Sequence, residues 1–214
     1  HLLEGYGLSE TSPVVCINPP GIGSKPGSIG LPIPGTICEV VSIDDGRTLM
    51  KPGATGEICF RGPQVIMGSW PSPKTPAEAI IDGWLHTGDV GHIDEEGYVF
   101  ITDRLKEMIN ASGFKVYPRL VEEAIYQHPA VRECAVIGVA DAYRGQTVKA
   151  IVTVKAGQSL SADELLKFLQ SRLSKIERPT QGECRADLTK TAVGKISKKD
   201  LYDLEARGQG AKQG

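Results

Sequence analysis

The sequence of 214 residues lacks any long apolar run. Its apolar stretches fall well short of the roughly 18 residues that a membrane-spanning helix requires, and its first residues do not follow the basic, apolar and small-residue order of a signal peptide. Hydrophobic residues make up 40% and charged residues 23% of the chain, which excludes collagen-like, coiled-coil and wholly disordered compositions. We therefore expect a globular, cytoplasmic protein without a transmembrane segment, and peripheral attachment to a membrane stays open.

Cysteine is scarce and widely spaced. The five cysteines lie at least 21 residues apart, so neighbours in sequence cannot form a zinc knuckle or a Cys-x-x-Cys redox pair. Their odd number, in a chain without a recognisable secretory signal, predicts reduced and mostly buried thiols. The residues concerned are Cys16, Cys38, Cys59, Cys134 and Cys184.

Generic catalytic signatures are missing as well. A Walker A loop ending at Gly194 and Lys195 fails, because Thr189 stands where the first glycine is required and Ile196 follows the lysine. A nucleophile elbow around Ser9 fails at its last glycine, and no His-Glu-x-x-His string is present. Composition and spacing alone indicate only a two-part globular protein.

Charge and backbone-breaking residues divide the chain near Asp103. Residues 1–103 carry 5 basic and 13 acidic residues, whereas residues 104–214 carry 19 basic and 13 acidic ones. Glycine and proline number 27 in the first part and 12 in the second. This division predicts two domains. The basic second part suits nucleotide phosphates, although a solvated lysine-rich face explains the same charge; we expect no nucleic-acid partner.

The first part has the pattern of short strands joined by turns. Alternating or β-branched runs at residues 39–43, 57–61, 90–93 and 98–102 predict strands, and turn residues at 44–46 and 95–97 separate them. We expect a small antiparallel β unit.

The second part alternates helices and strands. A helix is expected from Pro118, with Val121, Ala124, Ile125 and His128 on one face, followed by strands at 134–139 and 148–154. A second helix is expected from Ser161, which forms a capping box with Glu164 and precedes an apolar stripe that runs to Leu173. The whole chain is therefore predicted to be α+β, with a compact α+β module at its C-terminal end.

Five longer strings stand in a fixed order along the chain. They are Gly-Tyr-Gly-Leu-Ser-Glu-Thr at 5–11, Gly-Trp-Leu-His-Thr-Gly-Asp at 83–89, Asp-Arg-Leu-Lys-Glu-Met-Ile at 103–109, Ser-Gly-Phe-Lys-Val-Tyr-Pro at 112–118 and Thr-Ala-Val-Gly-Lys-Ile at 191–196. In this order and spacing they resemble the successive motifs of the adenylate-forming superfamily, which comprises acyl-CoA synthetases, luciferases and peptide-synthetase adenylation domains. The strings at 2–8, 26–32 and 112–114 look most like bacterial long-chain fatty-acyl-CoA synthetases.

The resemblance implies a reaction and an incomplete set of parts. In the family, a fatty carboxylate attacks ATP to give an acyl-adenylate, and coenzyme A then displaces AMP; Mg²⁺ assists. Residues 1–103 would be the end of the large N-terminal domain and residues 104–214 the mobile C-terminal domain. The family's phosphate loop and most of its large domain are not among these residues, so we expect the fragment to need that missing domain and to be inactive alone.

The resemblance also assigns nucleotide contacts. Glu10 matches the carboxylate that coordinates magnesium, and Ser9 stands where a hydroxyl donates to the α-phosphate. Asp89 matches the residue that accepts hydrogen bonds from both ribose hydroxyls, and Arg104 a second ribose contact. Tyr6, followed by Gly7, matches the aromatic residue that stacks on adenine.

Three further assignments concern the second part. Lys195 matches the catalytic lysine that bonds the attacking carboxylate and the transferring phosphate. Lys106, two residues after Arg104, matches the hinge about which the C-terminal domain rotates. Gly113 matches a glycine that lets the pantetheine arm of coenzyme A pass.

The sequence departs from the family pattern in three places. Thr189 replaces a proline before the catalytic loop, so a rigid turn is missing there. Residues 182–184 read Gly-Glu-Cys where a strand with a large apolar residue is usual, and residues 68–70 read Gly-Ser-Trp instead of Gly-Tyr-Trp.

Two other interpretations stay open. An aryl- or medium-chain acid-CoA ligase, or a peptide-synthetase adenylation domain, would keep the same ATP residues. From a different class, the chain could be a non-catalytic module that binds a nucleotide or a partner protein. The joint presence of Glu10, Asp89, Arg104 and Lys195 argues against the second, since a binding module needs no catalytic lysine.

Overall fold

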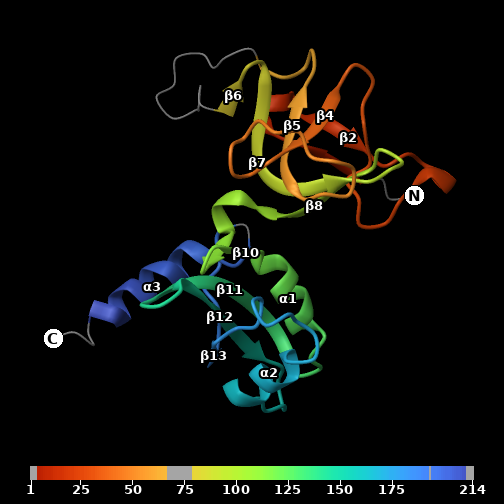
Figure 1. The fold of residues 1–214 in the computed structure, drawn as a ribbon. Coiled ribbons are helices and arrows are strands. Elements are labelled where there is room, and N and C mark those ends of the chain that lie inside the picture. The colour runs from red at the N-terminus through yellow and green to blue at the C-terminus, as the bar shows by residue number, and fades with distance from the viewer. Residues whose placement is uncertain (1–3, 67–78, 193, 211–214) are drawn as a thin grey trace. The chain divides into compact units, whose positions relative to one another are not determined.

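The computed structural model describes residues 4–66, 79–192 and 194–210 and divides into two compact units (Figure 1). The first unit spans His1–Lys106 and the second Glu107–Gly214. The division falls three residues after the boundary that composition predicts. The departure at residues 68–70 lies outside the described residues.

The first unit contains two antiparallel sheets. A three-stranded sheet has the order β1-β2-β3, and a five-stranded sheet has the order β4-β5-β7-β6, with β8 also paired to β7. The strands are β1 (Gly5–Gly7), β2 (Val14–Ile17), β3 (Leu31–Pro32), β4 (Ile37–Val41), β5 (Gly56–Arg61), β6 (Ile80–Ile81), β7 (Trp84–Ile93) and β8 (Val99–Arg104). Three short 3₁₀ segments are η1 (Ser9–Thr11), η2 (Gly21–Gly23) and η4 (Leu105–Glu107).

The strands predicted in this unit are present, with changed limits. β4 lies two residues earlier than its predicted range, and β7 begins at Trp84 and therefore includes the whole segment around Asp89. The side chains of Val15, Ile58, Phe60 and Val99 are fully buried in the core between the sheets; Cys16 and Val40 join them.

The β7–β8 pair contains one irregularity. Asp89 lies opposite Arg104 and Val90 opposite Asp103, but Gly91 lies opposite Ile101, so Thr102 is an extra residue on β8. A Cβ at Gly91 would lie 1.9 Å from the carbonyl oxygen of Phe100, so only glycine fits at this close approach.

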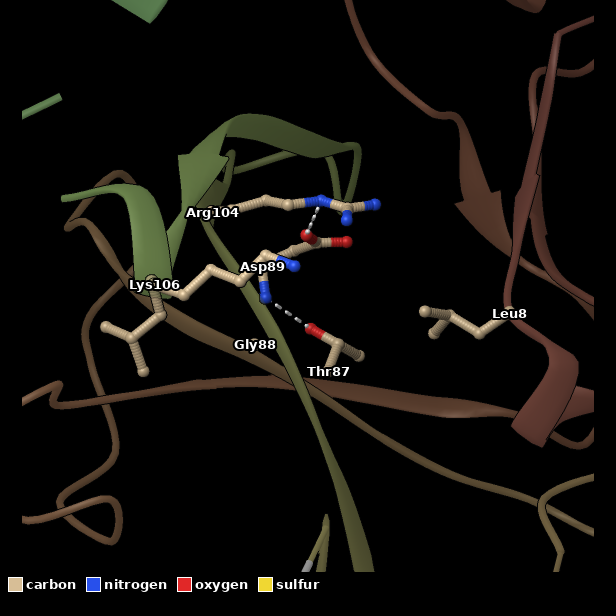
Figure 2. Close-up of a pocket in the computed structure, with 7 residues that line it drawn as sticks. Leu8, Thr87, Gly88, Asp89, Arg104 and Lys106 are labelled. Carbon is tan, nitrogen blue, oxygen red and sulfur yellow. Dashed lines mark hydrogen bonds and ion pairs between the residues drawn. The ribbon is translucent and has the colours of Figure 1, made fainter. Parts of the chain in front are cut away.

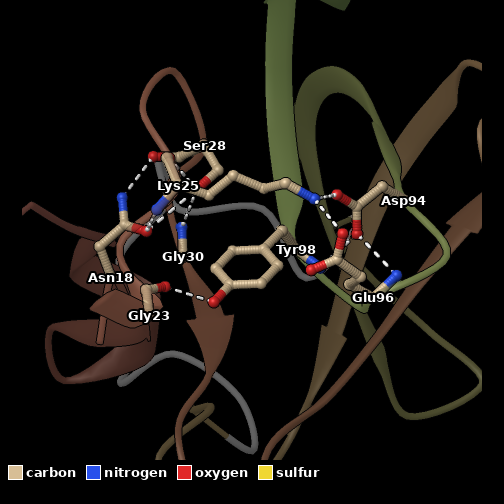
Figure 3. A network of polar contacts seen from close by, with 8 residues as sticks. All are labelled: Asn18, Gly23, Lys25, Ser28, Gly30, Asp94, Glu96 and Tyr98. Carbon is tan, nitrogen blue, oxygen red and sulfur yellow. Dashed lines mark hydrogen bonds and ion pairs between the residues drawn. The ribbon is translucent and has the colours of Figure 1, made fainter. Parts of the chain in front are cut away.

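A polar network ties the loop after β2 to the turn between β7 and β8 (Figure 3). The Lys25 ammonium binds the carboxylates of Asp94 and Glu96, and these bonds, with that to Asp94 the larger cause, raise the lysine pKa. The Tyr98 hydroxyl donates to the Gly23 carbonyl, and Asn18 Nδ2 donates to the Ser28 carbonyl at 2.8 Å. The turn that carries Asp94 is thereby held against the three-stranded sheet.

The second unit is a five-stranded sheet with helices on both faces. Its order is β10-β9-β12-β11, and β13 runs parallel to β12, whereas the other pairs are antiparallel. The strands are β9 (Ile109–Ala111), β10 (Phe114–Val116), β11 (Val131–Asp141), β12 (Gly145–Val154) and β13 (Gln181–Arg185). The helices are α1 (Pro118–Tyr126), α2 (Ala162–Leu169) and α3 (Lys198–Gly210).

Alternation along β11 and β12 explains the two covered faces. One face, which includes Val136 and Ala150, packs against the apolar stripes of α1 and α2. The opposite face, which includes Ile137 and Ile151, packs against Leu201 of α3. Each strand is buried on both sides, as its nearly continuous apolar sequence requires.

The predicted helices are present, but the second is shorter than expected. The capping box of Ser161 and Glu164 forms, and the helix ends at Leu169 instead of reaching Leu173. Arg178 explains this end, because its guanidinium donates to the carbonyls of Gln170 and Leu173. Leu173 still packs against the core from beyond the helix.

The first helix begins at Pro118 as predicted, with Val121, Ala124 and Ile125 buried. His128 lies beyond the end of this helix. Its ring contacts the Phe168 ring edge-on, with 4.6 Å between the ring centroids.

All five cysteines are free, and three of them, Cys16, Cys59 and Cys134, are buried. Burial raises the pKa of each of these three thiols to about 12. Cys184 is exposed, an exception to the expected pattern. Among the described residues, no helix is long and apolar enough to cross a membrane.

Candidate functional site

The polar site of the first unit is built on the β7–β8 pair. Asp89 is only 5% exposed, and its Oδ1 lies 3.4 Å from Nε of Arg104, its cross-strand neighbour. The Tyr6 hydroxyl, from β1, donates to the other carboxylate oxygen. Figure 2 shows the Asp89 carboxylate facing the Arg104 side chain. Antiparallel register thus brings together two residues of opposite charge that stand 15 positions apart in sequence.

A dense set of hydrogen bonds fixes the segment that leads to Asp89. Thr87 Oγ1 donates to the Ile58 carbonyl at 2.7 Å and accepts from the Asp89 N–H at 3.0 Å. Glu57 Oε1 accepts from the Gly88 N–H at 3.0 Å, while its Oε2 lies 2.8 Å from Nδ1 of His86. Gly88 has a φ of 69°, the left-handed region that favours glycine. The direction of the Asp89 side chain is therefore set by neighbouring strands.

Two cavities meet at this segment. One, of about 370 Å³, is lined by Asp89, Arg104 and Lys106. The other, of about 330 Å³, is lined by Glu10 and Glu57. Leu8, Thr87 and Gly88 belong to both walls. The walls of the two cavities thus present three carboxylates, those of Asp89, Glu10 and Glu57, and two cations, Arg104 and Lys106.

The string that contains Lys195 forms a hairpin in the second unit. Lys190 and Ile196 pair, the Thr191 N–H donates to the Lys195 carbonyl at 2.7 Å, and the Lys195 N–H donates to Thr191 Oγ1 at 3.2 Å. Gly194 has a φ of 80° and its N–H donates to the Thr191 carbonyl at 2.9 Å. The Lys195 side chain is exposed at this hairpin.

Family models match both parts of the chain. The model described as AMP-binding enzyme matches residues 1–70, and the model described as AMP-binding enzyme C-terminal domain matches residues 120–195. The chain belongs to the AMP-binding enzyme family.

The named relatives of this chain are CoA ligases. It is 48% identical to a long-chain-fatty-acid–CoA ligase of Bacillus subtilis (strain 168) over 95% of the chain and 36% of the relative. It is 46% identical to the ligase of the same name from Escherichia coli O157:H7, over 98% of the chain and 36% of the relative. The chain therefore spans about a third of the length of these relatives.

Solved structures agree on the α+β fold. ATP-bound MatB from Rhodopseudomonas palustris matches with a TM-score of 0.86 and 35% identity, over 95% of this chain and 40% of that one. The o-succinylbenzoate CoA synthetase of Bacillus subtilis in complex with its acyl-adenylate intermediate matches with a TM-score of 0.81 and 30% identity, over 93% and 40%.

Tyr6 has a polar role that the sequence did not suggest. The centroid of its ring lies 6.1 Å from the centroid of the Phe60 ring, and the two ring planes are tilted to each other. Its hydroxyl donates a hydrogen bond to Asp89. Burial, followed by the hydrogen bond to Asp89, raises the pKa of Tyr6 far above its usual value. Stacking of Tyr6 on adenine stays a prediction.

The two glycines assigned to ligand contact also have local structural reasons. A Cβ at Gly7 would lie 1.7 Å from the Pro13 carbonyl oxygen, which excludes any larger residue. Gly113 has a φ of 85° and follows Ser112 in the two-residue turn of the β9–β10 hairpin, where left-handed backbone is required. Space around Gly113 is open.

Ser9 and Glu10 lie on η1, and Glu10 lines the cavity of about 330 Å³. Thr11 holds this segment, because its Oγ1 accepts from the Leu8 N–H and donates to the Leu8 carbonyl, both at 2.9 Å. Ser9 is exposed and Glu10 half-buried, with Glu10 at the wall of the 330 Å³ cavity. A single hard carboxylate of this kind fits Mg²⁺, which takes one or two protein carboxylates and completes its shell with water and phosphate.

Sequence reasoning missed the support that Glu57 gives to the segment before Asp89. Glu57 was recognised only as part of a strand. Its role depends on pairing between β5 and β7, which puts Glu57 beside the turn at Gly88. A buried glutamate in an apolar strand was the one available signal.

Proposed function

We propose that this chain is the C-terminal part of an ATP-dependent long-chain fatty-acid–CoA ligase, in which residues 1–103 end the large domain and residues 104–214 form the mobile domain. The observation that carries the proposal is the cross-strand pair of the buried Asp89 carboxylate and the exposed Arg104 side chain at the wall of a cavity. The identity of 46–48% with long-chain-fatty-acid–CoA ligases supports the acyl class.

The ribose of ATP binds at Asp89. Both carboxylate oxygens are already directed by donors, Tyr6 on one and Arg104 on the other. The 2′ and 3′ hydroxyls take up the same two oxygens, and the exposed Arg104 side chain moves aside to contact the sugar. A preformed acceptor pair of this kind needs little reorganisation when the nucleotide arrives.

The phosphates extend toward η1. Ser9 donates to the α-phosphate, and Glu10 holds Mg²⁺ from the wall of the adjacent cavity. The ion supplies positive charge beside the phosphate oxygens. Leu8, Thr87 and Gly88, which line both cavities, give the nucleotide a continuous path from ribose to phosphate.

Two half-reactions follow, with different groups in use. In the first, the fatty carboxylate attacks the α-phosphorus and pyrophosphate leaves, while Lys195 stabilises the charge on the attacking and transferring oxygens. In the second, rotation about Lys106 withdraws Lys195 and brings the turn at Gly113 to the bound acyl-adenylate. The open space around Gly113 lets the pantetheine arm of coenzyme A pass. A cytoplasmic location, where ATP and coenzyme A are supplied, belongs to the same proposal.

An aromatic acid is the main competing substrate. The chain is 38% identical to an indoleacetate–CoA ligase of Aromatoleum aromaticum, which is lower than its identity with the long-chain ligases of Bacillus and Escherichia. This difference favours the fatty acid.

A chimera tests the nucleotide assignment. It joins the part of the Bacillus subtilis relative that precedes the matched segment to residues 1–214. We expect palmitate-dependent release of pyrophosphate and formation of palmitoyl-CoA, whereas the 214-residue chain alone forms no acyl-adenylate and binds ATP weakly.

Within this chimera, Asp89→Ala should raise KM for ATP by about 5- to 150-fold, because two hydrogen bonds to the ribose hydroxyls are lost, at about 0.5–1.5 kcal/mol each. Glu96→Ala, a change of another carboxylate in the same unit, is the matched control. An unchanged KM for ATP in Asp89→Ala would refute the ribose site, and adenylate formation by the chain alone would refute the need for a preceding domain.

A further inference from the structure

Three side chains of different metal-binding chemistry meet on one face of the five-stranded sheet. A carboxylate oxygen of Glu57, Sγ of Cys59 and a ring nitrogen of His86 all lie within 4.8 Å of one another. The register explains the cluster: Cys59 on β5 lies opposite His86 on β7, and Glu57 precedes Cys59 by two residues on the same face. Spacing in sequence does not reveal it, because the ligands come from two strands.

The cluster is buried and already oriented. Cys59 is 1% exposed and Glu57 7%, and the side chain of His86 is 11% exposed. The Gly88 N–H donates to Glu57 Oε1 and thereby fixes the carboxylate from outside the cluster. Outer contacts of this kind commonly orient the ligands of metal sites.

A separate cavity gives access to the cluster. It has a volume of about 260 Å³, and its lining includes Glu39, Cys59 and His86. Glu39 on β4 lies directly opposite Cys59, on the side away from His86. The row of Glu39, Cys59 and His86 across three strands therefore places a second carboxylate beside the thiol.

We propose that Glu57, Cys59 and His86 form a binding site for a zinc-like divalent cation, with the fourth position directed to the cavity and to Glu39. Sulfur, nitrogen and one oxygen are the ligands that Zn²⁺ accepts, whereas Mg²⁺ prefers six oxygens. Zinc bonds of 2.0–2.3 Å in tetrahedral geometry require ligand atoms about 3.3–3.8 Å apart. The ligand atoms lie within 4.8 Å of one another, so binding requires their separations to shorten by at most about 1.0–1.5 Å. Binding releases the thiol proton to solvent and leaves a metal-bound thiolate.

Occupancy of the site changes the segment before Asp89. A cation on Glu57 Oε2 leaves Oε1 to the Gly88 N–H but draws negative charge from the carboxylate, so it alters that hydrogen bond and the amide at the turn before Asp89. Any resulting change in ATP binding at Asp89 rests on the proposed function, but the shift of the Gly88 amide does not.

Cobalt titration of the 214-residue chain tests the site. Co²⁺ in place of Zn²⁺ should give a thiolate-to-cobalt charge-transfer absorption together with the intense visible bands of tetrahedral cobalt, and added Zn²⁺ should remove both. In Cys59→Ser the charge-transfer absorption should disappear and the affinity should fall by at least about tenfold, since loss of an outer contact alone costs about 10–100-fold. His86→Gln should lower the affinity similarly.

Cys184→Ser is the matched control, because it removes an exposed thiol and leaves the cluster intact. Retention of the charge-transfer absorption in Cys59→Ser, its loss in Cys184→Ser, or its absence from the unmodified chain would overturn the site. Nitrogen-15 NMR of the same samples tests the coupling: the Gly88 amide should shift with Zn²⁺ in the unmodified chain and not in Cys59→Ser. A metal-bound chain with an unmoved Gly88 amide would overturn the coupling alone, and inactivity of the chimera would affect neither result.

Discussion

Asp89 in the first unit and Lys195 in the second are held in opposite ways. Asp89 is buried on a strand, with its backbone bound to Thr87 and its carboxylate to Tyr6 and Arg104. Lys195 is exposed just after the turn of a hairpin, and its described hydrogen bonds, both with Thr191, involve its backbone. The sheet therefore fixes the position and direction of the carboxylate, whereas the hairpin fixes only the base of a long, flexible side chain.

This difference matches the two tasks that we propose. A group that binds the same sugar through both half-reactions gains from a fixed position, because no reorganisation is needed at each turnover. A cation that serves one half-reaction and then withdraws gains from a mobile support. The hairpin is nevertheless ordered without the usual proline: an ion pair of 2.6 Å between Lys190 and Glu133 anchors its first strand.

Removal of the Lys195 ammonium should have the largest effect. In the chimera, Lys195→Ala should lower the rate of acyl-adenylate formation by about 10²–10³, the loss typical of a positioned charge-stabilising group. Conversion of supplied acyl-adenylate and coenzyme A to thioester should persist. Lys199→Ala, which changes a nearby exposed lysine, is the control, and pyrophosphate release and thioester formation are measured separately. Equal losses in both half-reactions would contradict the division of tasks.

Rigidifying the hinge should separate the two half-reactions. Lys106→Pro fixes φ near −65°, at the residue where the two units divide. We expect adenylation to continue and thioester formation to fall on the order of 10²-fold, since small misplacements of reacting groups cost about that much. Lys106→Ala should leave both rates close to normal. A proline variant that performs both steps at full rate would exclude rotation at this residue.

A half-buried lysine bound to two carboxylates should distinguish the two units by stability. Lys198 Nζ, at the start of α3, lies 2.8 Å from Glu107 Oε2 and 3.0 Å from Glu122 Oε1. Lys198→Met leaves two carboxylates without this donor and should lower the free energy of unfolding of the second unit by about 1–3 kcal/mol. Hydrogen exchange should show the loss in β11 and β12 but not in β5 and β7, and Lys199→Met should change neither. Equal loss of protection in both units would show that they unfold together.

The smallest effect is expected at an exposed turn of the first unit. Asp45 accepts hydrogen bonds from the Thr48 hydroxyl and from the Thr48 and Arg47 N–H groups, which lower its pKa from 3.8 to about 2. Because the folded pKa is the lower one, this stabilisation is complete above pH 3.8 and is lost as pH falls toward 2. The difference in denaturant midpoint between the unmodified chain and Asp45→Ala should therefore shrink from pH 5 to pH 3. A difference that stays constant over this range would contradict the assignment.

Sequence patterns were sufficient for much of the fold. Pro118 marked a helix start and the pair Ser161 and Glu164 a capping box, since both depend on neighbours in sequence. The end of α2 could not be predicted in the same way, because it is capped by Arg178, eight residues beyond Gln170. Sequence rules therefore predict a helix boundary that neighbouring residues define, but not one that depends on a side chain from outside the helix.

The candidate site divides along the same line. Asp89 and Arg104 could be identified because they stand in recognisable strings, but the bond of Tyr6 to Asp89 spans 83 positions and appears only in the fold. The support by Glu57 likewise requires β5 to pair with β7. A motif names the groups that meet a ligand, and the sheet determines which other groups hold them.

The extra residue on β8 has a consequence for the sign of charge beside Asp89. Counting from the pair of Gly91 and Ile101, an uninterrupted ladder would set Asp103 opposite Asp89, so two carboxylates would repel across the strands. Thr102 advances the ladder by one step and puts Arg104 there instead. A single extra residue in β8 thus replaces a pair of like charges by a pair of opposite charges. The length of this strand between the two pairs therefore determines the sign of the charge that faces Asp89.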